Sequence, residues 1–387
     1  MTPPAPHLES KLPDVGTTIF TIMSQMALDH QAINLSQGYP DYDGPNALKE
    51  RLNYYVGAGY NQYAPLAGVP VLRTQLARKL ERFYDHRADA DTDITVTPGA
   101  TVAIFCAVHA VVRPGDEVLM FDPVYDCYDP AVRLAGGIAR HLTLAAPDYR
   151  IDWDAVGRAV NSRTRMIMIN SPHNPTGSVL TADDLAALTT LAERHDLIVV
   201  ADEVYEHLVF DGRAHASVLR HPRLAARSYA VFSFGKTFSV TGWKTGYCVA
   251  PPGLMQEFRR VYQFVAFVAV TPLQYALADF LAAAPEYLDQ LPAFYQGKRD
   301  LFTVAMAGSR FKLTPSTGTF FQLADYSAVA DIGDMQMVEW LTKEVGVAAI
   351  PLSVFYQQPD PAQRYVRFCF CKEDHTLRAA AAKLAAL

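Results

Sequence analysis

The sequence predicts an α/β fold built on a mostly parallel sheet that is buried on both faces. Short, continuously apolar segments recur along the middle of the chain, and helical patterns such as residues 181–195 separate them. Strands that are apolar at every position, rather than at alternate positions, are typical of a parallel sheet covered by helices on both sides. With 387 residues, half of them hydrophobic, the chain is long enough to form two domains.

The expected strands follow one another at intervals that leave room for helices. They occupy residues 94–97, 117–121, 165–170, 197–201, 228–232 and 247–250. Pro98 and Gly99 turn the first strand into an apolar helix at residues 100–112. This order of strand, turn and helix indicates the large domain, which we place at residues 41–277.

The pattern changes past residue 278, where an alanine-rich helical stretch begins. Shorter strands are expected near residues 311–313, 319–323 and 365–370, and a final helix carries Leu377, Ala381 and Leu384. We expect a smaller α+β domain that combines an N-terminal arm with the C-terminal part of the chain, residues 1–40 and 278–387.

Composition and charge exclude several classes of function. The formal net charge is -6 and no block of Lys or Arg is present, so nucleic acid is not an expected partner. The most apolar stretches, residues 100–112 and 264–270, are too short to span a membrane, and the first residues do not form a signal-peptide pattern. Five cysteines without zinc-site spacing are expected to be reduced thiols in the cytoplasm, and no metal is expected.

Lys236 is the most informative residue of the chain. It follows an apolar strand and precedes a glycine-rich turn, with Ser233 three residues before it and Lys244 eight residues after it. A lysine desolvated near another cation has a lowered pKa, which suits it to hold an aldehyde cofactor as a Schiff base and to move a proton. The local Gly-Lys-Thr run resembles the end of a phosphate-binding P-loop, but Ala230 stands where that motif requires glycine.

Polar residues after other strands fit the ring of pyridoxal phosphate. Asp202 follows the apolar residues 197–201, and a carboxylate there would keep the ring nitrogen protonated. Tyr205 and Asn174 could both bond the phenolate oxygen of the ring. Tyr125 could stack on the ring, and packing in the core is the alternative for this residue.

A phosphate group requires backbone N–H groups, ideally at a helix N-terminus. Gly99, Ala100 and Thr101 lie at such a junction of strand and helix. Ser233 and Lys244 would complete the phosphate site.

Arg367 lies in an apolar strand near the C-terminus, where a guanidinium is costly unless it is paired. It could bind a substrate carboxylate in a bidentate manner. An internal salt bridge is the alternative.

Together these motifs resemble the class I and II aminotransferases of fold type I, which are pyridoxal phosphate-dependent, over nearly the whole chain. The shared pattern is Asn174-Pro175-x-Gly177, Asp202-x-x-Tyr205, Ser233-x-x-Lys236 with a cation at position 244, and Arg367. Within the family, the chain looks most similar to the methionine aminotransferase and kynurenine aminotransferase branch, at residues 34–41, 61–63, 233–247 and 349–356.

The resemblance implies further roles. Lys236 would carry the cofactor, and Tyr63 would reach the phosphate of the neighbouring subunit, because the family places its sites at the interface of a homodimer. The backbone N–H of Gly38 would bind the substrate carboxylate with Asn174 and Arg367. The walls of the side-chain pocket would be Phe20, Tyr125 and Phe355.

The sequence thus predicts a pyridoxal phosphate-dependent aminotransferase with ping-pong kinetics. It would move an amino group from a bulky apolar, thioether or aromatic amino acid, such as methionine or kynurenine, to a 2-oxo acid. No second arginine is evident for a side-chain carboxylate, so aspartate is not an expected donor. A carbon–sulfur β-lyase acting on cysteine conjugates would use the same cofactor contacts. A cofactor-binding regulatory module would need a DNA-binding domain, for which 387 residues leave no room.

Overall fold

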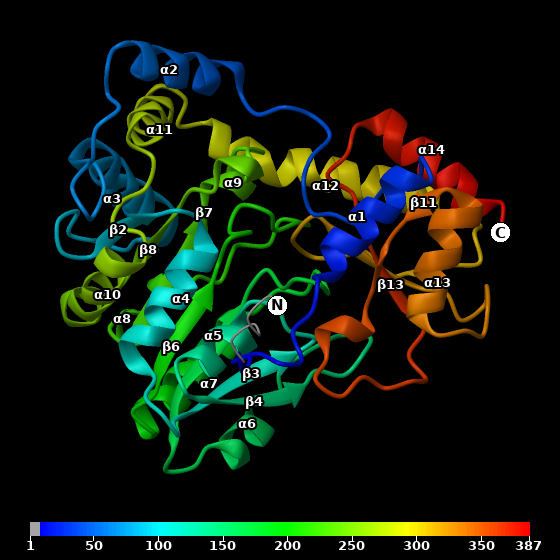
Figure 1. The fold of residues 1–387 in the computed structure, drawn as a ribbon, viewed down its shortest axis with the longest axis horizontal. Helices are drawn as coiled ribbons and strands as arrows, with labels where there is room; N and C mark the ends of the chain where they lie inside the picture. Colours follow the sequence, from blue (N-terminus) through cyan, green and yellow to red (C-terminus); the bar gives the residue numbers. More distant parts are fainter. Residues whose placement is uncertain (1–7) are drawn as a thin grey trace, which may run out of the picture.

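A computed structural model describes residues 8–387 of the chain. A seven-stranded sheet forms its centre, with the strand order β2-β8-β7-β6-β5-β3-β4 (Figure 1). The strands are β2 (Ile94–Thr97), β3 (Glu117–Asp122), β4 (Ile138–Thr143), β5 (Thr164–Asn170), β6 (Ile198–Asp202), β7 (Ser228–Ser233) and β8 (Gly246–Val249).

The mostly parallel sheet that the sequence predicts is confirmed. Strands β4, β3, β5, β6 and β7 pair in parallel, and β8 runs antiparallel to both β7 and β2. The sequence analysis missed β4, because this edge strand is only partly buried and carries Arg140 and His141 among its apolar residues.

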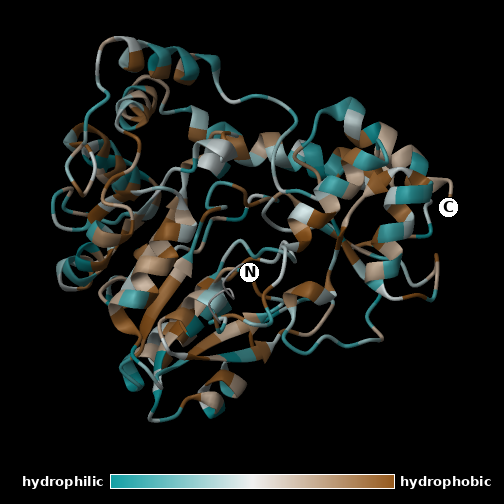
Figure 2. Ribbon diagram, viewed as in Figure 1, coloured by the Kyte–Doolittle hydropathy of each residue, from teal (hydrophilic) through white to brown (hydrophobic). Residues whose placement is uncertain are grey.

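Alternate residues of the central strands enter two separate hydrophobic cores, one on each face of the sheet. Val118 and Met120 of β3 pack in the core that includes α4 and α10, whereas Leu119 and Phe121 pack in the core that includes α3 and α7. Figure 2 shows the strands as hydrophobic and the outer helices as mixed in character. The helices of this part are α2 (Asn46–Gly57), α3 (Pro70–Tyr84), α4 (Ala100–Val111), α5 (Tyr128–Leu134), α6 (Trp153–Ala159), α7 (Ala182–Arg194), α8 (Pro222–Ala225), α9 (Phe234–Thr237), α10 (Pro252–Val265) and α11 (Thr271–Ala283).

The N-terminal arm joins the C-terminal part of the chain. Strand β1 (Ile33–Asn34) pairs in parallel with β11 (Val347–Ala348), and α1 (Ile19–Asp29) packs beside them (Figure 1). A second sheet has the order β12-β13-β10-β9, formed by β9 (Lys312–Leu313), β10 (Phe321–Asp325), β12 (Ile350–Pro351) and β13 (Tyr365–Cys369). Its helices are α12 (Tyr287–Ala305), α13 (Asp334–Trp340) and α14 (Asp374–Ala385).

Short helical turns complete the fold: η1 (Val218–Arg220), η2 (Thr241–Trp243), the π-helical turn η3 (Leu341–Val345) and η4 (Ser353–Phe355). The division into domains stays a prediction, and residue 277 lies within α11. Among residues 8–387, no helix has both the length and the apolar character needed to cross a membrane.

Candidate active site

A cavity of about 320 Å³ lies where β5, β6 and β7 end. The carboxyl edge of a mostly parallel sheet is the usual ligand site of such folds. Most of the predicted site residues line this cavity: Phe20, Gly38, Gly99, Ala100, Thr101, Tyr125, Asn174, Asp202, Tyr205, Ser233, Lys236, Lys244 and Arg367. The fold therefore brings together residues from the N-terminal arm, the central sheet and the C-terminal part.

Two predicted residues do not line the cavity of this chain. Phe355 is buried behind it, with its ring centroid 6.1 Å from that of Phe20 and 5.4 Å from Cζ of Arg367. Tyr63 is 82% exposed, and its ring meets Phe267 edge-on at 5.4 Å. The role of Tyr63 in a neighbouring subunit stays a prediction.

Asp202 is the last residue of β6 and lies beside Asn170, the last residue of β5. Its carboxylate accepts hydrogen bonds from the Tyr128 hydroxyl at 2.6 Å and from the backbone N–H of Val204 at 3.2 Å. Burial raises the pKa of Asp202 to about 6, although both hydrogen bonds act in the opposite direction. Within residues 8–387, no cation pairs with this carboxylate, so a protonated ring nitrogen fits the position.

Lys236 lies in α9, less than one turn beyond the end of β7. Its Nζ donates a hydrogen bond to the carbonyl oxygen of Gly38 at 3.1 Å and lies 5.7 Å from the ring centroid of Tyr205. Burial lowers the pKa of Lys236, and the positive charge of Arg367 also lowers it. The amine thus lies inside the cavity with an increased share of the neutral form.

The first turn of α4 forms a cradle for an anion. Gly99 precedes the helix with φ 84° and ψ 169°, a conformation that is essentially restricted to glycine. A Cβ atom at this position would lie 3.6 Å from Nζ of Lys244. Backbone N–H groups at the start of α4 and the ammonium group of Lys244 therefore face the same space, which fits a phosphate group.

Arg367 is 1% exposed and extends from β13 to the cavity. Its guanidinium donates hydrogen bonds to Oδ1 of Asn174 at 2.7 Å and to the carbonyl oxygen of Ser36 at 3.0 Å, and Cζ lies 3.8 Å from the ring centroid of Phe321. Burial lowers the pKa of Arg367 to about 10. In the described part of the chain, no carboxylate pairs with this group and its Nε lacks an acceptor, so an internal salt bridge does not explain it.

The sequence analysis missed several residues of the site. Tyr128 lies three residues beyond Tyr125, at the start of α5. This short distance from a predicted site residue was the one feature of the sequence that could have indicated Tyr128. Asn170 donates from Nδ2 to the carbonyl oxygen of Asp202 and accepts from the backbone N–H of Asn174, at 2.9 and 2.8 Å. Tyr128 does not itself line the cavity, whereas Asn170 does, together with Gln37, Tyr39, Val204, Thr241, Thr245 and Phe321.

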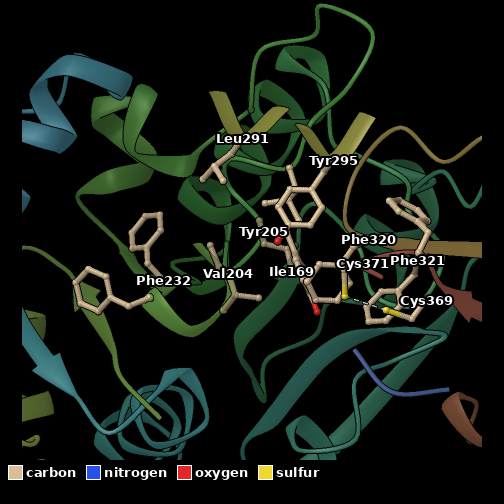
Figure 3. Close-up of a cluster of buried hydrophobic side chains, with 14 of the residues drawn as sticks. Ile169, Val204, Tyr205, Phe232, Leu291, Tyr295, Phe320, Phe321, Cys369 and Cys371 are labelled. Atoms are coloured by element: carbon tan, nitrogen blue, oxygen red, sulfur yellow. Dashed lines mark hydrogen bonds between the residues drawn. The ribbon is translucent and has the colours of Figure 1, made fainter. Parts of the chain in front are cut away.

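Aromatic rings and thiols form a buried cluster beside the cavity (Figure 3). Tyr205 meets the rings of Phe320 and Phe321 edge-on, with centroid distances of 5.0 and 6.0 Å. The sulfur atoms of Cys369 and Cys371 lie 3.1 Å apart in the same cluster, as the dashed line in Figure 3 marks. Close packing on this side holds the Tyr205 ring in place.

These features define a class of enzyme. A buried lysine amine, a carboxylate without a cation and an anion cradle surround one cavity at the carboxyl edge of an α/β sheet. Pyridoxal phosphate carries an aldehyde, a basic ring nitrogen and a phosphate group, and each of these groups has a matching partner here.

Comparison with known proteins gives the family. Residues 30–384 match the family described as aminotransferase class I and II, and the chain belongs to this family. The protein is a pyridoxal phosphate-dependent aminotransferase, as the sequence analysis predicted.

The chain is 52% identical to the methionine aminotransferase of Escherichia coli K12, over 97% of both sequences. It is 33% identical to human kynurenine–oxoglutarate transaminase 3, over 96% of this chain and 88% of that protein. The crystal structure of YbdL from Escherichia coli, described as having a methionine aminotransferase function, superimposes with a TM-score of 0.97 at 51% identity, covering 99% of this chain and all of that one. The predicted branch of the family is therefore confirmed.

Proposed function

We propose that this aminotransferase takes its amino group from methionine or from another bulky apolar or aromatic amino acid. The observation that carries the proposal is the stacking of Arg367 on Phe321, with Cζ 3.8 Å from the ring centroid, beside Phe20. Arg367 is the one guanidinium among the described residues that line the cavity. A donor whose α-carboxylate binds this arginine meets aromatic rings with its side chain, and among the described residues that line the cavity of this chain no second arginine faces an acidic side chain.

The fit of the cavity supports a role for each residue around the cofactor. When bound, pyridoxal phosphate supplies an electron sink that stabilises the charge left on Cα after a proton is removed. We assign Asp202 to the ring nitrogen, Asn174 and Tyr205 to the phenolate oxygen, and Tyr125 to the face of the ring. The proposed phosphate ligands are Gly99, Ala100, Thr101, Ser233 and Lys244.

Lys236 is the proposed catalytic residue. With the cofactor bound, its Nζ would remove the proton from Cα of the donor and deliver it to the carbon of the cofactor that carries the transferred nitrogen, and the lowered pKa of Lys236 favours this role near neutral pH. Arg367, Asn174 and the backbone N–H of Gly38 hold the carboxylate of the donor. Fixing the carboxylate places the Cα–H bond within reach of the amine, and this positioning accelerates proton transfer.

We also infer that the enzyme works as a homodimer in the cytoplasm. Tyr63 and Phe264 are 82% and 86% exposed, and the exposed Phe267 contacts Tyr63. The hydroxyl of Thr271 donates to the carbonyl oxygen of Gln62 at 2.7 Å and so joins the two segments that carry these rings. An exposed apolar patch of this kind is typical of a protein interface, and a second copy of the chain is the proposed partner.

A panel of amino donors tests the proposed substrate. The purified enzyme is loaded with pyridoxal phosphate, and methionine, phenylalanine, kynurenine and aspartate compete for a single 2-oxo acid. We expect methionine or an aromatic donor to have the highest kcat/KM, and the Lys236→Ala variant to bind the cofactor without turnover. A higher kcat/KM for aspartate would contradict the proposed specificity. Release of pyruvate from a cysteine conjugate without an added 2-oxo acid would favour the β-lyase.

A further inference from the structure

A cluster of buried charged side chains lies behind the cofactor cavity. In the segment that runs from the end of β6 to Glu206, Asp202, Val204 and Tyr205 line the cavity, whereas Glu203 and Glu206 do not. Both glutamates are nevertheless buried, at 2% and 4% exposure. One short segment therefore carries residues that line the cavity together with two buried carboxylates that do not line it.

Lys79 of α3 is the cation of this cluster. Its Nζ pairs with Oε2 of Glu206, which also accepts a hydrogen bond from the hydroxyl of Tyr84. The same Nζ donates a hydrogen bond to the hydroxyl of Tyr247 at 2.8 Å and lies 5.1 Å from the ring centroid of Phe232. One buried ammonium group thus joins α3, the segment after β6, and β8.

The contact with Tyr247 leads to the proposed phosphate site. Tyr247 directly follows Gly246, and a Cβ atom at Gly246 would lie 3.2 Å from the backbone nitrogen of Ala100 at the start of α4. Lys244 is only three residues before Tyr247. The position of β8 therefore determines how the Lys244 turn and the first turn of α4 approach each other.

The contact with Glu206 leads to the ring side of the site. Glu206 is the residue next to Tyr205, and its backbone N–H donates to the carbonyl oxygen of Glu203 at 2.9 Å. A turn fixed in this way at Glu206 leaves the neighbouring Tyr205 little freedom. Tyr205 therefore lies in a turn that is closed by the hydrogen bond between Glu206 and Glu203 and is held at Glu206 by Lys79.

A buried ion pair is a costly way to stabilise a fold, since desolvation of the two charges offsets much of their attraction. Burial indeed lowers the pKa of Lys79. Apolar residues of similar volume would serve packing equally well. The directional bonds of the ammonium group offer what apolar contacts lack, namely a fixed distance between two segments.

We propose that Lys79 is a positioning residue of the active site, because its bonds to Glu206 and Tyr247 set the position of Tyr205 relative to the phosphate cradle at Lys244. The proposal rests on the cofactor roles proposed above for Tyr205 and Lys244. Lys79 itself does not line the cavity and is no catalytic residue.

The Lys79→Met variant tests the proposal, and Lys298→Met is its matched control. Lys298 is also a buried lysine with an ion pair, to Asp374 at 2.7 Å, but it does not line the cavity or contact this cluster. Three quantities are measured on the full chain: the Kd of pyridoxal phosphate, the Tm with and without it, and the midpoint pH of the absorbance change of the bound cofactor.

For Lys79→Met we expect the Kd of pyridoxal phosphate to rise about tenfold. A change of this size corresponds to the loss of roughly one charged hydrogen bond. The midpoint should move to higher pH, because a misplaced Tyr205 hydroxyl no longer stabilises the negatively charged cofactor oxygen. Lys298→Met should lower Tm while its Kd and midpoint stay within about twofold and about 0.2 pH unit of the wild type.

Tyr247→Phe provides a milder variant in case Lys79→Met does not fold. It removes one oxygen atom but retains the ring stacked on Phe232, at 4.8 Å between centroids. We expect its Kd to rise about threefold, since β8 loses its bond to Lys79. A wild-type Kd and midpoint in both variants, even with a lowered Tm, would overturn the positioning role. Failure of the wild-type enzyme to bind pyridoxal phosphate would instead overturn the proposed cofactor site.

Discussion

The hydroxyl of Tyr128 donates a hydrogen bond to Oδ2 of Asp202 at 2.6 Å, and both side chains are buried. This bond favours the ionised carboxylate, whereas burial favours the protonated form and raises the pKa of Asp202 to about 6. Tyr128 therefore helps to decide whether Asp202 is charged near neutral pH. The charge matters because only the carboxylate can keep the ring nitrogen of the cofactor protonated.

Replacement of Tyr128 by Phe should shift the pH dependence of cofactor binding. In the wild type, Asp202 is ionised above a pH of about 6, so affinity is full there and falls as the pH drops through this value, by up to about tenfold per pH unit. Loss of the hydrogen bond raises the pKa of Asp202 further, so the fall should begin at higher pH. Titration of the apoenzyme with pyridoxal phosphate between about pH 5 and 8 measures the shift.

Tyr326→Phe is the control for this variant, because the buried Tyr326 hydroxyl donates to the carbonyl oxygen of Ile332 at 2.9 Å, in the C-terminal part of the chain. Its binding profile should coincide with that of the wild type. Identical profiles for Tyr128→Phe and Tyr326→Phe would show that Tyr128 does not act on the charge of Asp202.

Gly99→Ala should weaken both the fold and the cofactor site. Gly99 has φ 84° and ψ 169°, where a Cβ atom adds strain of about 1–3 kcal/mol. Relief of the strain would turn the first N–H groups of α4 away from Lys244. We expect a lower free energy of unfolding in urea and a higher Kd for pyridoxal phosphate. The control is Gly253→Ala, in α10 with open space around its Cα. It should change neither the free energy of unfolding nor the free energy of cofactor binding by more than about 0.5 kcal/mol.

Two of the predicted site residues share a property that is visible in the sequence. Asp202 and Lys236 follow apolar strands, and a polar side chain after a buried strand is visible in the sequence. Tyr128, Phe321 and Lys79 were missed because their local patterns are those of ordinary core or helix residues. Their function depends on contacts with residues distant in the sequence, such as the pair of Lys79 and Glu206.

Phe355 illustrates the same limit from the other side. The resemblance implies that it forms a wall of the substrate pocket, whereas in the structure it is buried next to Phe20 without lining the cavity, and its backbone oxygen accepts a hydrogen bond from the backbone N–H of Val124 at 2.7 Å. A family motif indicates which residues gather at a site. Which of two neighbouring rings faces the cavity depends on packing, which the motif does not encode.

Arg367→Lys should impair binding of the amino donor more than binding of the cofactor. The guanidinium holds Asn174 and Ser36 and still presents Nε, whereas a lysine lacks this fork of donors. Loss of one charged hydrogen bond to the substrate costs about 1.5–3 kcal/mol, so kcat/KM for methionine should fall roughly 10- to 150-fold. Steady-state kinetics measure this fall, and the Kd of pyridoxal phosphate, measured in parallel, should change by a smaller factor.

Arg299→Lys is a matched control, since the buried Arg299 binds Asp211 at 2.7 and 2.8 Å, and neither residue lines the cavity. This variant should lose stability but keep its kcat/KM within about twofold. An equal loss of kcat/KM in both variants would mean that Arg367 contributes only to the fold.

Hybrid dimers test whether Tyr63 acts in the neighbouring subunit. Tyr63→Ala should weaken every site of its homodimer, and Lys236→Ala should abolish turnover. In a hybrid of the two variants, one site combines an intact Lys236 with the Tyr63 of the partner chain. Random exchange of equal amounts makes half of the dimers hybrids with one intact site each, so activity should recover to about a quarter of the wild-type value.

Recovery of activity requires that Tyr63 of one chain acts on the site of the other chain, because neither variant carries both Tyr63 and Lys236 in one chain. If Tyr63 acted on the site of its own chain, the activity of the mixture would stay below that of the Tyr63→Ala homodimer, since every subunit with Lys236 would still lack the tyrosine. A mixture of Lys236→Ala with wild type is the control for the exchange procedure, because its activity should be half that of the wild type both before and after the subunits exchange. The high exposure of Tyr63 and its distance from the cavity of its own chain favour recovery.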